Sequence, residues 1–100
     1  MAIAAENNIQ AVFQTQRATI KYIDASNGEW PNSWEDLALA EPGFDFEWVA
    51  SQIEFEFNCD PAVLAKLRPD EFKAIKQKNE YYDIEPELKT IIVTLRKYHW

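Results

Sequence analysis

Apolar side chains recur at helical spacing over the first quarter of the chain. One side of such a helix would carry Ile9, Val12, Phe13, Gln16, Ile20 and Ile23. A neighbouring polar stripe would carry Gln10, Gln14, Arg17, Lys21 and Asp24. The pattern predicts an amphipathic helix from about residue 6 to residue 26, roughly 30 Å long at 1.5 Å per residue. Asn27-Gly28 should end it, because glycine just after a helix adopts the left-handed conformation without steric cost.

A rigid turn and a short second helix follow. Trp30 precedes Pro31, and the residue before proline is held in an extended conformation. Ser33 is a predicted N-cap whose hydroxyl can accept the backbone N–H of Asp36 in a variant of the capping box. Acids in the first turn suit the positive end of the helix dipole. The helix should run from about residue 34 to residue 40 and end at Pro42-Gly43.

Residues 44–57 contain two runs in which apolar and acidic residues alternate. These runs are Phe44-Asp45-Phe46-Glu47-Trp48 and Ile53-Glu54-Phe55-Glu56-Phe57. Period two predicts strands with an aromatic core face. A hairpin turning at Ala50-Ser51 would place Glu47 opposite Glu54, and like charges directly across a pair are destabilising. The alternative is a helical turn through 46–51 that feeds one strand. A strand at 53–57 is common to both arrangements.

The second half of the chain predicts further helices. Asp60-Pro61 begins one, with Asp as the N-cap and Pro at the first helical position. Pro69 interrupts it, and Phe72 and Ile75 mark a further helical turn. Residues 76–83 form a polar connector.

The last helix should span about 86–98, with acids at its start and Arg96 and Lys97 at its end. Its apolar stripe is Leu88, Ile91, Ile92, Leu95 and Tyr98. With 47% hydrophobic and 14% aromatic residues, the chain can build one core. The sequence therefore predicts a single α+β domain over residues 1–100, in which helices dominate and the antiparallel sheet is small.

Charge is distributed unevenly along the chain. The net charge is −7, and the segment from residue 22 to residue 65 contains no Lys or Arg. The acids in that segment are Asp24, Glu29, Glu35, Asp36, Glu41, Asp45, Glu47, Glu54, Glu56 and Asp60. An acidic surface disfavours nucleic acid as a partner, because phosphate contacts require a basic one. The segment indicates either a solvated face or a docking surface for a basic protein.

Several classes of chemistry lack the residues they need. With only Gly28 and Gly43, no glycine-rich phosphate loop is possible. A single Cys59 and a single His99 make neither a zinc site nor a nucleophilic triad. The acidic set Asp45, Glu47, Glu54, Glu56 and Asp60 could hold Ca²⁺ or act as an acid/base pair, but its spacing matches no calcium loop. We therefore expect a domain without cofactor or metal that is not an enzyme.

Candidate protein contacts come from aromatic and acidic residues. Trp30 and Trp34 flank Pro31 and would make a binding hot spot if both were exposed. The alternative is that they clamp the turn onto the first helix and fill the core. The other candidates are Glu54 and Glu56 on the predicted strand, and Tyr81 and Tyr82 on the connector.

The helix and turn together resemble the soluble region of type IV pilin-like and pseudopilin proteins. The residues that carry the resemblance lie within about 9–39: Thr19-Ile20-Lys21-Tyr22-Ile23, then Asn27-Gly28-Glu29-Trp30-Pro31 and Ser33-Trp34-Glu35-Asp36-Leu37. The family's hydrophobic N-terminal segment is absent, and the strands after Leu39 are too few for the usual pilin sheet. The second half, with Phe55-Glu56-Phe57 and Asp60-Pro61, is similar to bacterial domains of unassigned activity.

The resemblance implies a bacterial domain that acts through protein contacts in an envelope assembly. It would then be extracytoplasmic, with an anchor removed before Met1. The alternative is a cytoplasmic acidic inhibitor or immunity-type protein that binds a basic partner. A third class, a small hydrolase with paired carboxylates, would need two carboxyl groups in a concave pocket. No stretch of the sequence predicts a membrane-spanning helix. The oligomeric state stays open.

Overall fold

The computed structural model describes the backbone of residues 2–79 and 83–100 and the side chains of residues 9–79 and 83–100. The α-helices are α1 (Ala2–Ala25), α2 (Trp34–Ala40), α3 (Phe46–Gln52), α4 (Pro61–Leu64) and α5 (Glu85–His99). A 3₁₀ turn, η1, covers Pro69–Glu71, and the strands are β1 (Ile53–Phe55) and β2 (Ile75–Gln77). The predicted α+β class is confirmed, with helices dominating and a small antiparallel sheet.

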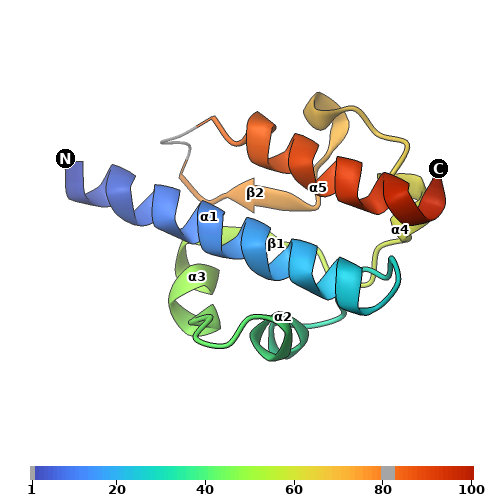
Figure 1. Ribbon diagram of the computed structural model, residues 1–100. Coiled ribbons are helices and arrows are strands. Elements are labelled where there is room, and N and C mark those ends of the chain that lie inside the picture. Colours follow the sequence, from blue (N-terminus) through green and yellow to red (C-terminus); the bar gives the residue numbers. More distant parts are fainter. Residues whose placement is uncertain (1, 80–82) are drawn as a thin grey trace.

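The long helix α1 is the central element of the fold. It lies beside α5 on one side, while α2 and α3 lie on its other side (Figure 1). The C-terminal ends of α1 and α5 meet, because Tyr98 Oη donates to Asp24 Oδ1 at 2.8 Å. The two helices therefore run in the same direction, and the sheet packs across them.

The sheet is made of segments far apart in the sequence. β1 pairs antiparallel with β2, so that Ile53 lies opposite Gln77 and Phe55 opposite Ile75. The predicted hairpin within 44–57 is wrong, and the alternative of a helix feeding one strand is confirmed. The predicted helical turn at Phe72 and Ile75 is corrected as well, since Ile75 begins β2. In the observed register Glu54 faces Lys76 rather than another acid, which removes the like-charge repulsion of the hairpin.

The helix α3 forms where the alternating pattern suggested a strand. Asp45 caps it, because its Oδ1 accepts the backbone N–H of Trp48 at 3.2 Å. Val49 is its buried residue, whereas Phe46 and Trp48 are only partly buried. The Asp45 cap favours a helix, and the hairpin strand would have placed like charges opposite each other. Together these effects outweigh the local alternation of apolar and acidic residues.

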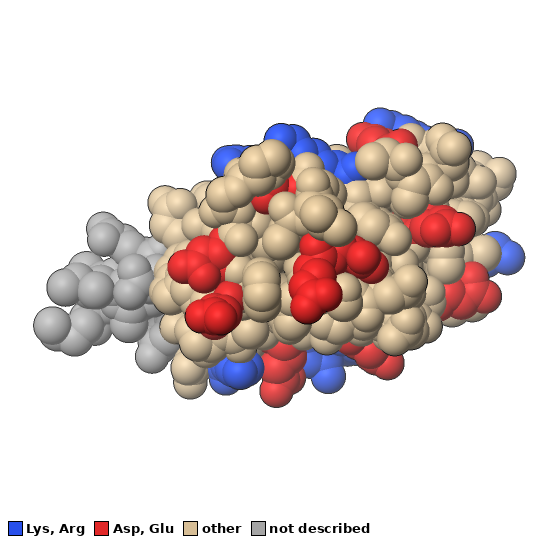
Figure 2. All heavy atoms as spheres, turned by 90° about the horizontal axis from the view of Figure 1, so that it is seen from below, with Lys and Arg blue, Asp and Glu red and all other residues tan. Residues whose placement is uncertain are grey.

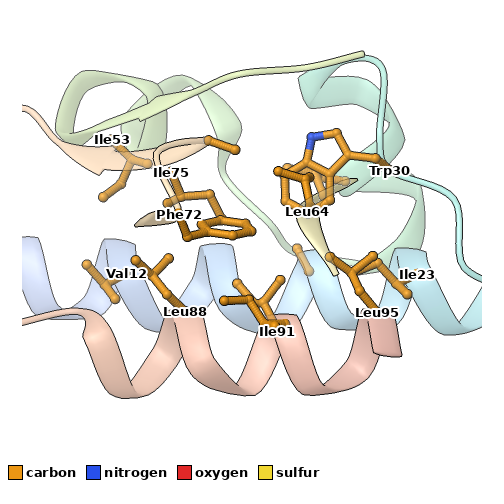
Figure 3. Packing of buried hydrophobic residues seen from close by; sticks show 14 of the residues in the cluster. Val12, Ile23, Trp30, Ile53, Leu64, Phe72, Ile75, Leu88, Ile91 and Leu95 are labelled. Carbon is orange, nitrogen blue, oxygen red and sulfur yellow. The ribbon is translucent and has the colours of Figure 1, made fainter. Parts of the chain in front are cut away.

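The core lies between the α1–α5 pair and the sheet. Figure 3 shows Val12 and Ile23 from α1 and Leu88, Ile91 and Leu95 from α5 directed toward a second layer. That layer includes Trp30, Ile53, Leu64, Phe72 and Ile75, all of which are buried. One continuous hydrophobic cluster therefore joins α1, α5 and the layer that contains the two strands.

The buried face of α1 is rotated from the predicted stripe. Besides Val12 and Ile23, the helix buries small side chains at Ala11, Thr15, Ala18 and Thr19. Both buried threonine hydroxyls are satisfied, because Thr15 donates to the Ala11 carbonyl at 2.7 Å and Thr19 to the Thr15 carbonyl at 2.6 Å. Predicted core positions such as Phe13 and Ile20 are only partly buried. The reason is that α1 is covered from several sides by α5, α2 and α3.

The turn after α1 is locked by α5. Asn27 takes the left-handed position (φ 59°), and Gly28 follows with φ 99° and donates to the Ile23 carbonyl at 2.8 Å. The first left-handed residue after the helix is thus Asn27 rather than the glycine that we predicted. Gly28 is buried because Tyr98 and His99 lie against it, with His99 Nε2 in hydrogen-bonding distance of the Gly28 carbonyl.

We predict that Gly28→Ala strongly lowers the free energy of unfolding. An alanine Cβ would overlap Tyr98 Cβ and lie 2.7 Å from Tyr98 Cγ, and the positive φ adds strain. The expected loss is about 2–4 kcal/mol, from overpacking and backbone strain together. Gly43→Ala is the matched control, since Gly43 has φ 89° but open space around it. Urea denaturation should show a loss of only about 1 kcal/mol for the control; equal losses would contradict the steric explanation.

A second prediction concerns alkaline pH. The hydrogen bond to Asp24 raises the pKa of Tyr98 above its ordinary value of 10.0, with smaller contributions from burial and the charge of Asp24. The stability from this bond is present below about pH 10 and is lost as pH rises through the raised pKa. In urea titrations between about pH 9 and pH 11, Tyr98→Phe should lose less stability than the parent. Equal losses would show that the bond does not contribute.

Candidate functional site

The outer side of α2 and α3 carries a concentration of carboxylates. We define the acidic face as Glu35, Asp36, Glu41, Asp45 and Glu47. Viewed from the α2–α3 side, acids are spread over the face, and Lys and Arg gather mostly toward its rim (Figure 2). The carboxylates follow the surface rather than converge on one point, which suits an extended contact better than a small ligand.

Three of these acids have structural roles. Asp36 Oδ2 accepts the backbone N–H of Asn32 at 2.9 Å, and Asp45 caps α3. Glu41 Oε2 lies 2.8 Å from Lys21 Nζ, so it is paired with a cation of α1. The Ser33 cap that we predicted is also present, with its hydroxyl accepting the Asp36 N–H at 3.3 Å.

Glu35 and Glu47 have no such role. Both side chains are exposed, and within the described part of the chain neither makes an ion pair or a side-chain hydrogen bond. Their charges are thus available to a partner without breaking any internal contact. Their mutation breaks no hydrogen bond or ion pair and should cost the fold only the favourable helix-dipole interaction of a first-turn acid, about 0.3–1 kcal/mol each.

A large apolar side chain also lies on this face. Leu39 of α2 is 83% exposed, one helical turn after Glu35. Our sequence reasoning did not single it out. No local pattern singles it out, because the choice between Leu37 and Leu39 as the core residue depends on what packs against α2; the structure buries Leu37 completely. A partner that buried Leu39 would gain apolar contact and would meet two carboxylates that make no internal ion pair.

Trp30 belongs to the core rather than to the surface. Its side chain is 3% exposed, and its Nε1 donates to the Glu56 carbonyl at 2.8 Å. The ring stacks on Phe55 with centroids 5.2 Å apart and meets Phe72 edge-on at 5.9 Å. Trp30 therefore fills the core, and a partner cannot reach it as a hot spot.

Trp34 is partly buried in the same aromatic cluster. It packs against Phe44, Phe55 and Phe57, with ring centroids 6.2, 5.6 and 5.2 Å away. The two tryptophans therefore tie the turn before α2 to the end of β1. Only Trp34 keeps an accessible edge.

The remaining predicted contacts fall elsewhere. Glu54 and Glu56 are exposed, but they lie on or just after β1 rather than on α2 and α3. Glu54 lies opposite Lys76. A cation next to Glu54 offsets part of its field, so this strand is a weaker attractor for a basic partner than the acidic face. Tyr81 and Tyr82 lie outside the described residues.

The candidates for metal binding and nucleophilic chemistry are the acidic set, Cys59 and His99. Among the described residues, no three His, Cys, Asp or Glu side chains come together in a way that could hold a metal ion. Burial, and secondarily the charge of Glu56, raises the pKa of the Cys59 thiol. A raised pKa lowers the thiolate fraction at neutral pH, which makes Cys59 a poor nucleophile. His99 is engaged at the junction of α1 and α5.

Comparisons with known proteins add no identity. No family model, curated protein or solved structure matches the chain. None of the described helices has both the length and the apolar content that a membrane crossing requires.

We predict that Trp30→Phe destabilises the domain more than Trp34→Phe. The first change removes the donor to the partly buried Glu56 carbonyl and leaves volume unfilled in the core. The expected loss is about 1–3 kcal/mol, since an unsatisfied polar group carries its full desolvation cost. Trp34→Phe, at a partly exposed position, should lose less than about 1 kcal/mol. Urea unfolding of the two variants provides the measurement, and the reverse order would contradict the assigned roles.

Proposed function

We propose that this domain binds a partner protein with a basic surface. The contact surface would be the acidic face together with Leu39. The observation that carries the proposal is the pairing of an 83% exposed leucine with the exposed, uncommitted carboxylates of Glu35 and Glu47. The segment between residues 22 and 65 contributes no Lys or Arg to this face, and the cation that pairs with Glu41 there is Lys21 of α1.

The two kinds of group would act differently. Burying a leucine side chain in a partner's pocket contributes about 1.5–3 kcal/mol. Exposed carboxylates around it contribute less to affinity but accelerate encounter with a cationic surface and orient it. Because Glu35 and Glu47 hold no internal partner, docking would cost the domain no existing ion pair. This is the behaviour expected of an acidic inhibitor or immunity-type protein.

A second candidate is an envelope assembly component of the pilin-like kind. The observation in its favour is that the first turns of α1 extend past the rest of the molecule, while the turn bearing Trp30 and Trp34 packs near its other end (Figure 1). In that case the partner recovered would be another assembly subunit. Its capture would not depend on Glu35 and Glu47.

The test is affinity capture from a cell lysate with three forms of the domain. The parent is compared with Glu35→Lys/Glu47→Lys and with a control, Asp70→Lys/Glu71→Lys, that changes the net charge equally on η1. We expect a basic protein to bind the parent and the control, and to be lost from the face variant. The complex should also dissociate at about 0.5 M salt, because exposed charges are screened.

Leu39→Ser separates the apolar contribution from the charge. It should leave the urea midpoint unchanged, since the side chain contacts little of the fold, and weaken the captured complex by roughly tenfold or more. The proposal is wrong if the face variant and the control retain the same basic protein equally. Capture of an acidic or neutral subunit by all forms would favour the assembly candidate.

A further inference from the structure

A second charged surface lies on the side of the molecule away from the acidic face, and it is basic. The outward side of α5 presents Lys89, Val93 and Lys97 at successive turns and continues to Trp100. Val93 is 49% exposed and Trp100 is 83% exposed. We call these four residues the basic face. In Figure 1, α5 and the α2–α3 side are separated by α1.

The helix α4 extends this surface, and Arg96 joins the two parts. Arg96 Nε donates to the Ala65 carbonyl at 2.7 Å, and a second guanidinium nitrogen lies 3.3 Å from the Leu67 carbonyl. The guanidinium carbon lies 4.9 Å from the centroid of the Trp100 ring, a cation–π distance. Trp100 is therefore held over an ordered arginine while its outer surface remains open. Nearby, Val63 of α4 and Lys66, two residues after the end of α4, are exposed.

We infer that the basic face binds an anionic lipid surface. Exposed lysines beside tryptophan and aliphatic side chains suit the membrane–water interface, where the cations meet lipid phosphates and the indole lies at headgroup depth. The face is the outside of a helix, and residues 89–100 line neither the hollow between η1, β2 and the start of α5 nor the hollow beside Glu41. A surface without a hollow fits a plane better than it fits a protruding loop of an acidic protein.

The negative net charge does not prevent this contact. The acidic face is separated from α5 by two helix–helix spacings, about 16–20 Å in all. That exceeds the screening length of about 8 Å at physiological salt. Of the nearer acids, Asp70 and Glu71 lie within 3.4 and 3.6 Å of Arg68. Glu85 lies one turn before Lys89, at the end of α5 opposite Trp100. Asp24, which holds Tyr98, and Asp60, which caps α4, lie on the adjoining elements. A lipid surface would be attracted by Lys66, Lys89 and Lys97, and these acids would offset part of that attraction.

The experiment is co-sedimentation with phosphatidylcholine vesicles that contain roughly one quarter phosphatidylglycerol. Binding is expected to the anionic vesicles, much less to pure phosphatidylcholine, and to weaken as salt is raised. Lys89→Glu/Lys97→Glu should lower the partition coefficient by roughly tenfold or more, since each lysine near such a surface contributes measurably. The control, Arg17→Glu/Lys78→Glu, has the same net charge and should bind nearly as the parent does, because Arg17 borders a hollow beside Glu41 and Lys78 lies next to Gln52 of α3.

A further variant keeps the test decisive if the charge reversal disturbs α5. Trp100→Ala changes no charge and should weaken binding several-fold, with an unchanged circular dichroism spectrum and urea midpoint. The inference is overturned if the parent does not bind anionic vesicles, or if the face variants bind as well as the control does. Binding to poly-glutamate without binding to vesicles would also overturn it and would assign the face to an acidic protein.

Discussion

The close packing of α1 against α5 is the constraint on which the rest of this structure depends. α1 supplies alanines and threonines to its buried face, and α5 supplies leucine and isoleucine. The pair is closed at one end by Gly28, whose missing side chain leaves room for Tyr98. Because the two C-terminal ends coincide there, the helices must run in the same direction, and everything between them in sequence has to be accommodated around this pair.

One consequence is that the small sheet forms from distant segments. The chain between the two helices runs over the pair and returns, so β1 and β2 meet as an antiparallel pair of strands over the core. Trp30 then ties the turn after α1 to these strands through the Glu56 carbonyl. Trp30 and Trp34, which the sequence offered as contacts for a partner, hold this turn against the strands instead. The helices α2 and α3 occupy the other side of α1.

A second consequence is the separation of charge. The acid-only segment folds into α2, α3 and β1, and two lysines of α5 lie on the far side of α1. The domain thus presents surfaces of opposite sign on opposite sides, with Leu39 exposed on one and Trp100 on the other. Each apolar side chain lies beside charged side chains that make no internal ion pair. For this reason we propose binding rather than chemistry for both surfaces.

Local patterns in the sequence were sufficient for features that depend on neighbouring residues. The caps at Ser33 and Asp60, the end of α1 near Asn27 and the extent of α5 all rest on contacts within a few positions, so they could be predicted. The concentration of acids was equally visible. What only the tertiary structure decided was pairing: the partner of β1, the face that α1 buries, and the exposure of Leu39 and Trp100. Period two at 44–48 was a false signal for a strand, because Asp45 caps a helix there and β1 pairs with the distant β2 instead. A residue is exposed or buried according to what packs against it, and that depends on segments far away in the chain.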